Sequence, residues 1–313
     1  MNHPSLADTS IAAAKTVEVS DGVYAYVQPD GSWYLNNTGF LVGSQGVISI
    51  DTSSTERRTR AYLEAISAIT RRPVRTLVNT HHHDDHTFGN CLLSGATIVG
   101  HERCREEVIA AGPATNRGVW TDVDWGDLEV AAPFLTYSQS VTLWSDELRC
   151  EVSYVGTPAH TTSDSIIHVP ERSVLFAGDL VFNGGTPFAL AGSISGAVEV
   201  LEKVVRPLGA QTIVPGHGPV CGPEVIDETL GYLRFVQDLA CQGWAAGLTP
   251  LQAARETDLG PYAELLDSER IVGNLHRAYV ELDGAGRGAR IDSEAALRDM
   301  ITYNGGQPLT CHA

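Results

Sequence analysis

The feature that most constrains this chain is a dense run of metal-binding side chain types. Residues 80–86 read Thr-His-His-His-Asp-Asp-His. The run follows a short apolar segment, residues 74–78, which the pattern predicts to be a β-strand. If the chain stays extended beyond that strand, His81 and His83 point to the same side, because side chains alternate along a strand. His82 then points away from them.

Asp85 and His86 follow at the start of an expected turn and can face the same cavity as the first two histidines. Four of the 11 histidines fall within residues 81–86, which chance explains poorly. An engineered tag would sit at a terminus, and this run is internal. Imidazole and carboxylate ligands together suit zinc or non-haem iron. The run therefore predicts a transition-metal site.

Three further polar residues stand where apolar strands are expected to end. His160 lies in Gly-Thr-Pro-Ala-His-Thr, Asp179 in Phe-Ala-Gly-Asp and His217 in Val-Pro-Gly-His-Gly. Strands of an α/β fold deliver the side chains at their ends to a common edge, where sites of such folds lie. We therefore expect these three residues to join the histidine run.

The chain order of expected elements favours a layered α/β fold with a helical end. Strands are predicted at 23–27, 40–42, 47–50, 74–78, 97–99, 148–155, 166–169, 174–176 and 212–214, the first three as an antiparallel meander. Helices are predicted after Asp51, where Ser53 and Glu56 have capping-box spacing, and at 101–111, near 196–206 and repeatedly from Glu224 onward. Residues 112–147 show no clear pattern. We expect a core over 1–221 and a helical extension over 222–313 that packs on it.

The motifs in this order resemble the metallo-β-lactamase superfamily. The resemblance rests on His-x-His-x-Asp-His at 81–86, the lone His160 followed by Thr, Gly-Asp ending at Asp179, and Gly-His-Gly around His217. Asp51, which closes the strand-like segment 46–51, also matches the family. The similarity runs from about residue 20 to about residue 221.

The resemblance implies an αββα sandwich with two divalent metal ions, zinc or else iron, at its edge. Seven side chains would hold them: His81, His83 and His160 for one ion, Asp85, His86 and His217 for the other, and Asp179 as a bridge. Asp51 would orient ligands without touching a metal.

This site would act as a hydrolase. Two ions share one water and lower its pKa from about 15.7 to near 7, which makes a bridging hydroxide nucleophile. Asp85 would accept a hydrogen bond from that water and later move a proton. Asp179 stands where the best-known zinc β-lactamases carry Cys or Ser, which favours a thioester, lactone or similar ester of a small molecule over a β-lactam. Three alternatives stay open: β-lactam hydrolysis, an iron-dependent oxidoreductase similar to the persulfide dioxygenases, and a binding protein without catalysis.

The charge and the cysteines of the chain limit the binding partners and the cellular location that we expect. With 21 Lys and Arg against 38 Asp and Glu, the formal net charge is −17, which argues against nucleic acid and anionic membranes as partners. The N-terminal 22 residues show no basic start with an apolar run, so we expect no secretory signal there. The six cysteines are scattered without a Cys-x-x-Cys pair, which favours reduced thiols and a cytoplasmic location. Four aromatic residues near expected strand ends, Trp33, Tyr34, Phe182 and Phe188, either line a pocket or belong to the core.

Overall fold

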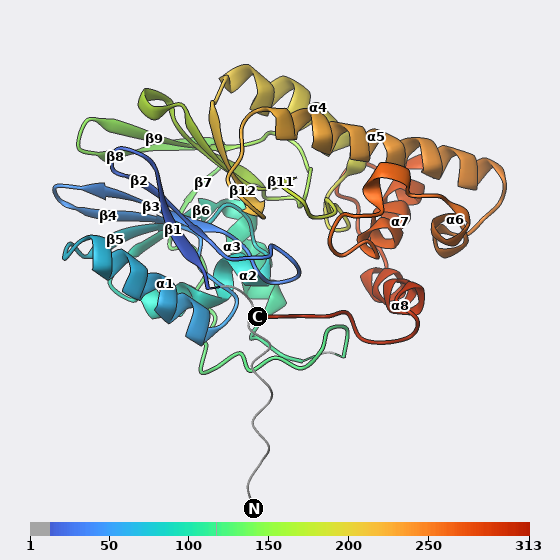
Figure 1. The fold of residues 1–313 in the computed structure, drawn as a ribbon, viewed down its shortest axis with the longest axis horizontal. Coiled ribbons are helices and arrows are strands. Elements are labelled where there is room, and N and C mark those ends of the chain that lie inside the picture. Colours follow the sequence, from blue (N-terminus) through green and yellow to red (C-terminus); the bar gives the residue numbers. More distant parts are fainter. Residues whose placement is uncertain (1–12, 117) are drawn as a thin grey trace, which may run out of the picture.

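A computed structural model describes residues 13–116 and 118–313 of the chain. Two β-sheets face each other, and helices cover their outer sides (Figure 1). The expectation about a secretory signal falls largely on residues 1–12, which lie outside the described residues.

The first sheet follows the chain order of its strands. These are β1 (Lys15–Ser20), β2 (Val23–Val27), β3 (Thr38–Gly43), β4 (Gly46–Ile50), β5 (Val74–Val78), β6 (Thr97–His101) and β7 (Leu135–Tyr137). Strands β2 to β4 pair antiparallel, which confirms the predicted meander, and β1, which the sequence did not predict, adds a fourth antiparallel strand at its edge. From β4 to β7 the pairing is parallel, so the carboxyl ends of these strands meet at one edge.

The second sheet has the order β12-β11-β10-β9-β8. Its strands are β8 (Ser140–Ser145), β9 (Leu148–Tyr154), β10 (Ser165–Val169), β11 (Val174–Phe182) and β12 (Thr212–His217). Only β11 and β12 are parallel among its pairs. Strands β7 and β8 come from the stretch that the sequence left unassigned.

The helices separate into two groups along the chain. Those before residue 222 are α1 (Glu56–Ile69), α2 (Asp84–Thr87), α3 (Glu102–Ala111) and α4 (Ile194–Val200), which continues as a π-helical turn (Leu201–Val205). Those after it are α5 (Glu224–Ala245), α6 (Pro250–Glu256), α7 (Arg270–Leu282) and α8 (Ser293–Tyr303). Among the described residues, no helix combines the length and the apolar character that crossing a membrane requires.

The start of α1 differs from the predicted capping box. Thr55, not Ser53, is the N-cap, and its side chain accepts a hydrogen bond from the Arg58 amide. Ser53 is fully buried one turn earlier. The Glu56 carboxylate accepts the backbone N–H of Asp127 and pairs with Arg60 one turn further along the helix. Four hydroxyl residues, Thr52 to Thr55, lie directly before this helix, and tertiary contacts decide which of them caps it.

Three apolar clusters define the layers. One lies between α1 and the first sheet, around Tyr62 and Ile66. A second lies between the two sheets and contains residues of both, including Val99 and Val152. The third lies between the second sheet and the helices beyond it. The order of layers is therefore helix, sheet, sheet, helix, as an αββα sandwich requires.

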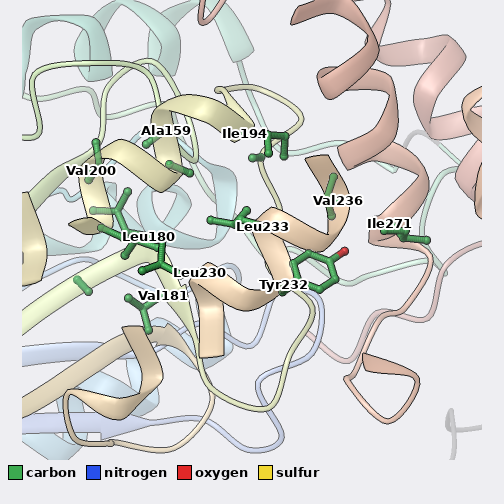
Figure 2. Packing of buried hydrophobic residues seen from close by; sticks show 14 of the residues in the cluster. Ala159, Leu180, Val181, Ile194, Val200, Leu230, Tyr232, Leu233, Val236 and Ile271 are labelled. Carbon is green, nitrogen blue, oxygen red and sulfur yellow. The ribbon is translucent and has the colours of Figure 1, made fainter. Parts of the chain in front are cut away.

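The third cluster also contains the C-terminal helices. Leu180 and Val181 of β11 belong to the same cluster as Leu230 and Leu233 of α5 and Ile271 of α7 (Figure 2). The helical extension therefore shares its apolar core with the second sheet.

Candidate metal centre

The seven side chains proposed as metal ligands come from five separate segments of the chain. His81 and His83 follow β5, Asp85 and His86 stand on α2, His160 follows β9, and Asp179 and His217 belong to β11 and β12. The structure gathers them into two adjoining groups: His81, His83, His160 and Asp179, and Asp85, His86 and His217. Within each group, the candidate ligand atoms all lie within 4.8 Å of one another.

Two strand positions differ in detail from the sequence interpretation. Asp179 lies inside β11, not after it, and His217 is the last residue of β12. The register between these strands is irregular around Gly178, which has a φ of 52°. Gly216 packs directly against this bend. A Cβ added to Gly216 would lie 1.9 Å from Asp179 Oδ1. The glycine of Gly-His-Gly that precedes His217 thus leaves room for the carboxylate.

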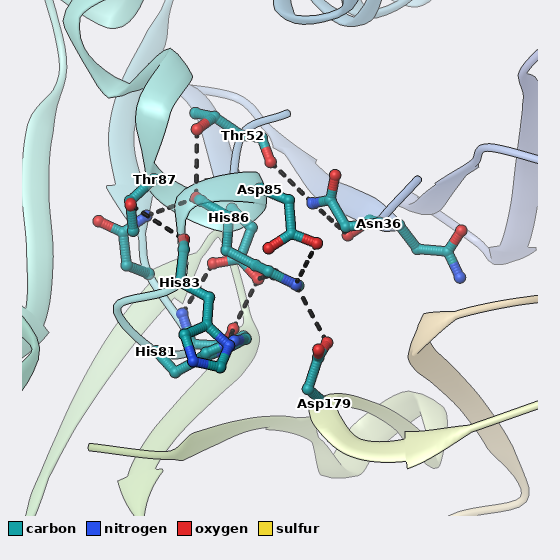
Figure 3. A network of polar contacts seen from close by, with 12 residues as sticks. Asn36, Thr52, His81, His83, Asp85, His86, Thr87 and Asp179 are labelled. Atoms are coloured by element: carbon teal, nitrogen blue, oxygen red, sulfur yellow. Dashed lines mark hydrogen bonds and ion pairs between the residues drawn. The ribbon is translucent and has the colours of Figure 1, made fainter. Parts of the chain in front are cut away.

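A shared aspartate, Asp51, orients His81 and His86, which Figure 3 shows in the polar network with Asp179. Asp51 Oδ2 accepts a hydrogen bond from His86 Nδ1 at 2.8 Å and another from the Thr80 hydroxyl at 2.7 Å. His81 Nδ1 lies 3.0 Å from the same hydroxyl and donates to it. Both rings are therefore held through Nδ1, which directs the Nε2 of each toward the cluster. Asp51 itself is buried.

Backbone carbonyls orient two more histidines. His217 Nδ1 lies 3.1 Å from the carbonyl oxygen of Gly31, and His160 Nδ1 is hydrogen-bonded to the carbonyl oxygen of Phe188. His83 has the opposite orientation, since its Nδ1 faces the cluster 2.8 Å from His160 Nε2.

The cluster contains buried polar atoms that no protein group satisfies. His81 Nε2, His86 Nε2 and Asp179 Oδ1 have no hydrogen-bond partner. His86 Nε2 and Asp179 Oδ1 are 3.0 Å apart but lack the alignment of a hydrogen bond. A buried polar group without a partner is costly, and a cation between these atoms would satisfy them together. The residues present therefore fit a metal ion.

The pKa shifts of the histidines also favour a bound cation. Burial holds the pKa of His81 and of His83 well below the usual value, so both imidazoles are neutral and able to coordinate. Burial also lowers the pKa of His217, but the carboxylates of Asp179 and Asp85 outweigh it and raise that pKa to about 9. The carboxylates thus stabilise positive charge at the centre, as they would the charge of a bound cation.

His82 does not join either group. Its Nδ1 lies 3.0 Å from the Ser163 hydroxyl, and its side chain borders a different depression from the metal-ligand residues. This agrees with the predicted alternation along the extended chain. Of the other described histidines, His101 ends β6 and accepts the Arg103 amide, and His276 pairs with Asp299 at 2.8 Å.

A cavity of about 140 Å³ opens onto the candidate ligands. Its wall contains five of them: His83, Asp85, His160, Asp179 and His217. All four aromatic residues singled out in the sequence line it as well: Trp33, Tyr34, Phe182 and Phe188. The sequence analysis missed Trp120, which belongs to the unassigned stretch, and Arg270 and Leu297, which come from the helical extension.

The extension also holds one loop of the site through a buried polar stripe, which sequence reasoning missed. Arg270, Asn274 and Arg277 lie on one face of α7 and are each at most 1% exposed. They bind the backbone of residues 186–190: Arg270 donates to the Thr186 carbonyl at 3.0 Å and Arg277 to the Leu190 carbonyl at 2.7 Å.

Asn274 completes this attachment from the middle of the stripe. It donates to the Pro187 carbonyl at 2.8 Å and accepts the Ala189 amide at 2.9 Å. The residue between these two is Phe188, whose carbonyl orients His160. The i, i+4, i+7 spacing of the stripe in the sequence was a usable signal, but polar residues at that spacing usually indicate a solvent-facing side.

Fold and site together define an αββα protein with His and Asp groups able to hold metal ions. The model of the metallo-β-lactamase superfamily matches residues 31–217, which is more than half of the chain. The chain belongs to that superfamily. A metallo-β-lactamase from Pontibacter korlensis has a similar structure, with a TM-score of 0.60 at 20% identity over 71% of this chain and 99% of that one.

Among curated proteins, the chain is similar to several with different names. It is 31% identical over 149 residues to the alpha subunit of a 2,4-dinitroanisole O-demethylase from Nocardioides sp., covering 47% of this chain and 41% of that protein. It is 31% identical over 150 residues to a hydroxyacylglutathione hydrolase from Rhodospirillum rubrum, covering 47% of each. It is 22% identical over 263 residues to a linear primary-alkylsulfatase from Pseudomonas sp., covering 70% of this chain and 49% of that protein. The chain thus spans about half the length of the curated relatives that it matches.

Proposed function

We propose that this chain is a hydrolase with a binuclear metal centre, which cleaves an ester-like bond of a small molecule such as a thioester or a lactone. The observation that carries the proposal is the pair of adjoining groups of buried imidazoles and carboxylates at the end of an aromatic cavity. Superfamily membership adds support, and so do the relatives named as a hydroxyacylglutathione hydrolase and an alkylsulfatase.

The ligand sets follow the two groups. His81, His83 and His160 would hold one ion, Asp85, His86 and His217 the other, and Asp179 would bridge them. Asp179 lies between the groups, with Oδ1 3.0 Å from His86 Nε2 and Oδ2 3.3 Å from His160 Nε2. Zinc suits this set of nitrogen and oxygen ligands, and so does iron.

Bound divalent ions would supply a water of lowered pKa and polarise the substrate oxygen. The chain supplies a group to handle the proton. Asp85 lines the cavity, and its Oδ2 lies 3.2 Å from His217 Nε2. The surrounding imidazoles, His86 first, keep the pKa of Asp85 below its usual value in spite of burial. Asp85 is therefore ionised at neutral pH and ready to accept a proton from the nucleophile and pass it to the leaving group.

Elemental analysis tests the metal centre first. Protein purified without a histidine tag or added metal is expected to carry about two zinc ions per chain. His81→Ala and Asp179→Ala should each remove most of the metal and the activity on a panel of thioesters, lactones and β-lactams. His82→Ala is the matched control, because this neighbouring imidazole faces Ser163 and not the cluster.

The outcomes separate the alternatives. If His82→Ala removes the metal as fully as His81→Ala does, the assignment of ligands is wrong. If the purified protein contains mainly iron and consumes oxygen, it is an oxidoreductase and the hydrolase proposal fails. If it holds no metal and the ligand variants behave like wild type, the site is not a metal centre.

A further inference from the structure

The cavity beside the metal centre has the size and the walls to receive a single aromatic ring. Its volume is about 140 Å³, close to the roughly 150 Å³ of an apolar cavity known to take benzene. Five aromatic side chains contribute to the wall: Trp33, Tyr34, Trp120, Phe182 and Phe188. A group as small as a methyl would leave most of this volume unfilled.

The rings of this wall stand edge to face, the arrangement that aromatic groups prefer. Trp33 meets Phe188 with centroids 5.3 Å apart at 84° and meets Trp120 at 5.5 Å and 70°. Trp120 in turn meets Tyr34 at 5.2 Å and 90°. A further ring inserted among them would find both faces and edges available for the same contacts.

The wall is fixed before any ligand arrives. The Trp33 indole N–H donates to Glu269 at 2.6 Å, and the Arg270 guanidinium lies 4.0 Å from the centre of the Trp33 ring. Both partners come from the helical extension, just before and at the start of α7. Phe188 is held through its neighbours by Asn274. A rigid wall favours a rigid, flat ligand, because binding then costs little ordering.

The charges of the wall argue against a second anionic group on the ligand. The guanidinium of Arg270 is already committed, with Nη2 2.8 Å from Asp267 Oδ2 and Nη1 donating to the Thr186 carbonyl. Apart from Arg270 and Asp84, the lining beyond the candidate ligands is aromatic or aliphatic, so a ring placed there meets a largely apolar surface.

From these observations we infer that the substrate carries a single aromatic ring next to the bond that is cleaved, seated between Trp33, Trp120 and Phe188. The inference rests on the proposed metal centre, since the ring is placed relative to the metal ligands that share the cavity. It goes beyond that proposal by assigning a substrate class, aryl esters or arene carboxylic esters of one ring.

The test is equilibrium binding to the full-length, metal-loaded protein, which needs no knowledge of the substrate. Three probes share one metal-chelating head and differ in the tail: acetohydroxamate, hexanohydroxamate and benzohydroxamate. We expect benzohydroxamate to bind at least about tenfold more tightly than acetohydroxamate, because the ring is buried. We expect it to bind about fivefold more tightly than hexanohydroxamate, because the ring adds edge-to-face contacts.

Leucine variants locate the effect. Trp120→Leu should reduce the advantage of benzohydroxamate over acetohydroxamate to about threefold or less. Phe188→Leu is the second variant if Trp120→Leu does not fold. Trp144→Leu is the matched control, since Trp144 is 62% exposed on β8 and does not line the cavity. It should keep the full preference.

Each outcome of these binding measurements either supports or overturns the inference. Equal binding of the three probes, or a preference for hexanohydroxamate, overturns the aromatic assignment while the metal centre stands. A preference that survives both cavity variants also overturns it, because the ring would then lie elsewhere. If elemental analysis finds metal but no hydroxamate binds, the cavity does not admit a ring to the centre, and the inference fails. Absence of metal defeats the proposed function itself and the inference with it.

Discussion

At the scale of single residues, the geometry of the candidate metal centre depends on which ring nitrogen of each histidine is hydrogen-bonded to the protein. Asp51 is decisive, because one carboxylate fixes His86 directly and His81 through the Thr80 hydroxyl. Its backbone has a φ of 56°, a left-handed conformation that asparagine also tolerates. The Asp51→Asn variant therefore changes the hydrogen bonding at this position without straining the chain.

We expect Asp51→Asn to weaken metal binding by about 10- to 100-fold, because asparagine has one acceptor oxygen where the carboxylate uses two: Oδ2 for His86 and the Thr80 hydroxyl, and Oδ1 for the Thr80 amide. Competition against a chelator followed by elemental analysis measures this. Asp146→Asn is the control: Asp146 has a φ of 53° and also accepts a backbone amide, that of Ser44, but lies on the exposed surface. If Asp51→Asn and wild type bind metal with equal affinity, Asp51 does not orient the ligands.

At the scale of elements, helix α7 governs the loop over residues 186–190. Asn274→Ala would leave the Pro187 carbonyl and the Ala189 amide buried without partners, at about 1–3 kcal/mol each. The free energy of unfolding should fall by about 2–6 kcal/mol. Metal affinity should also fall, by about tenfold, because the Phe188 carbonyl between these groups orients His160.

Urea unfolding and chelator competition together distinguish this role from a general loss of stability. His276→Ala on the same helix removes a hydrogen bond to Asp299 on α8, away from the loop. It should lower stability somewhat and leave metal affinity unchanged. Loss of stability without loss of metal affinity in Asn274→Ala would show that α7 does not position His160.

Elements also show where sequence reasoning succeeded. Long periodic segments and apolar runs predicted the meander, α1, α3 and the C-terminal helices, because burial of one face imposes the period on the sequence. Strand β7 has three residues, two of them exposed, and so carries no period to detect. The polar stripe of α7 is buried by the loop it binds, and no local pattern reveals a partner 80 residues earlier in the chain.

The candidate site was easier to predict than its surroundings. Ligand residues are chemically distinctive and stand near strand ends, so residue type and spacing were enough to single out all seven. The cavity wall is not distinctive in that way. Trp120 belongs to an irregular segment, and its place beside Tyr34 depends on backbone pairing with Leu309 at the far end of the chain. Long-range pairing of this kind leaves no signature in local sequence.

At the scale of the whole molecule, the question is whether residues 222–313 are a separate unit. Their largest helix, α5, contributes Val225, Ile226, Leu230, Leu233 and Val236 to the same apolar cluster as β11. At about 1.5–3 kcal/mol for each buried side chain, these five alone contribute roughly 8–15 kcal/mol. That is comparable to the entire net stability of an ordinary protein, about 5–15 kcal/mol.

A chain ending at residue 221 should therefore fail to fold. We expect it to be insoluble, or soluble with exposed apolar surface that binds a hydrophobic dye, and to hold no stoichiometric metal, since the attachment of residues 186–190 to α7 is gone. The full-length protein supplies the complementary measurement. Its urea unfolding should give one coincident transition by helical circular dichroism and by the near-ultraviolet signal of the tryptophans. A soluble 1–221 chain that binds two metal ions, or two separate transitions in the full-length protein, would instead make the helical extension an independent module.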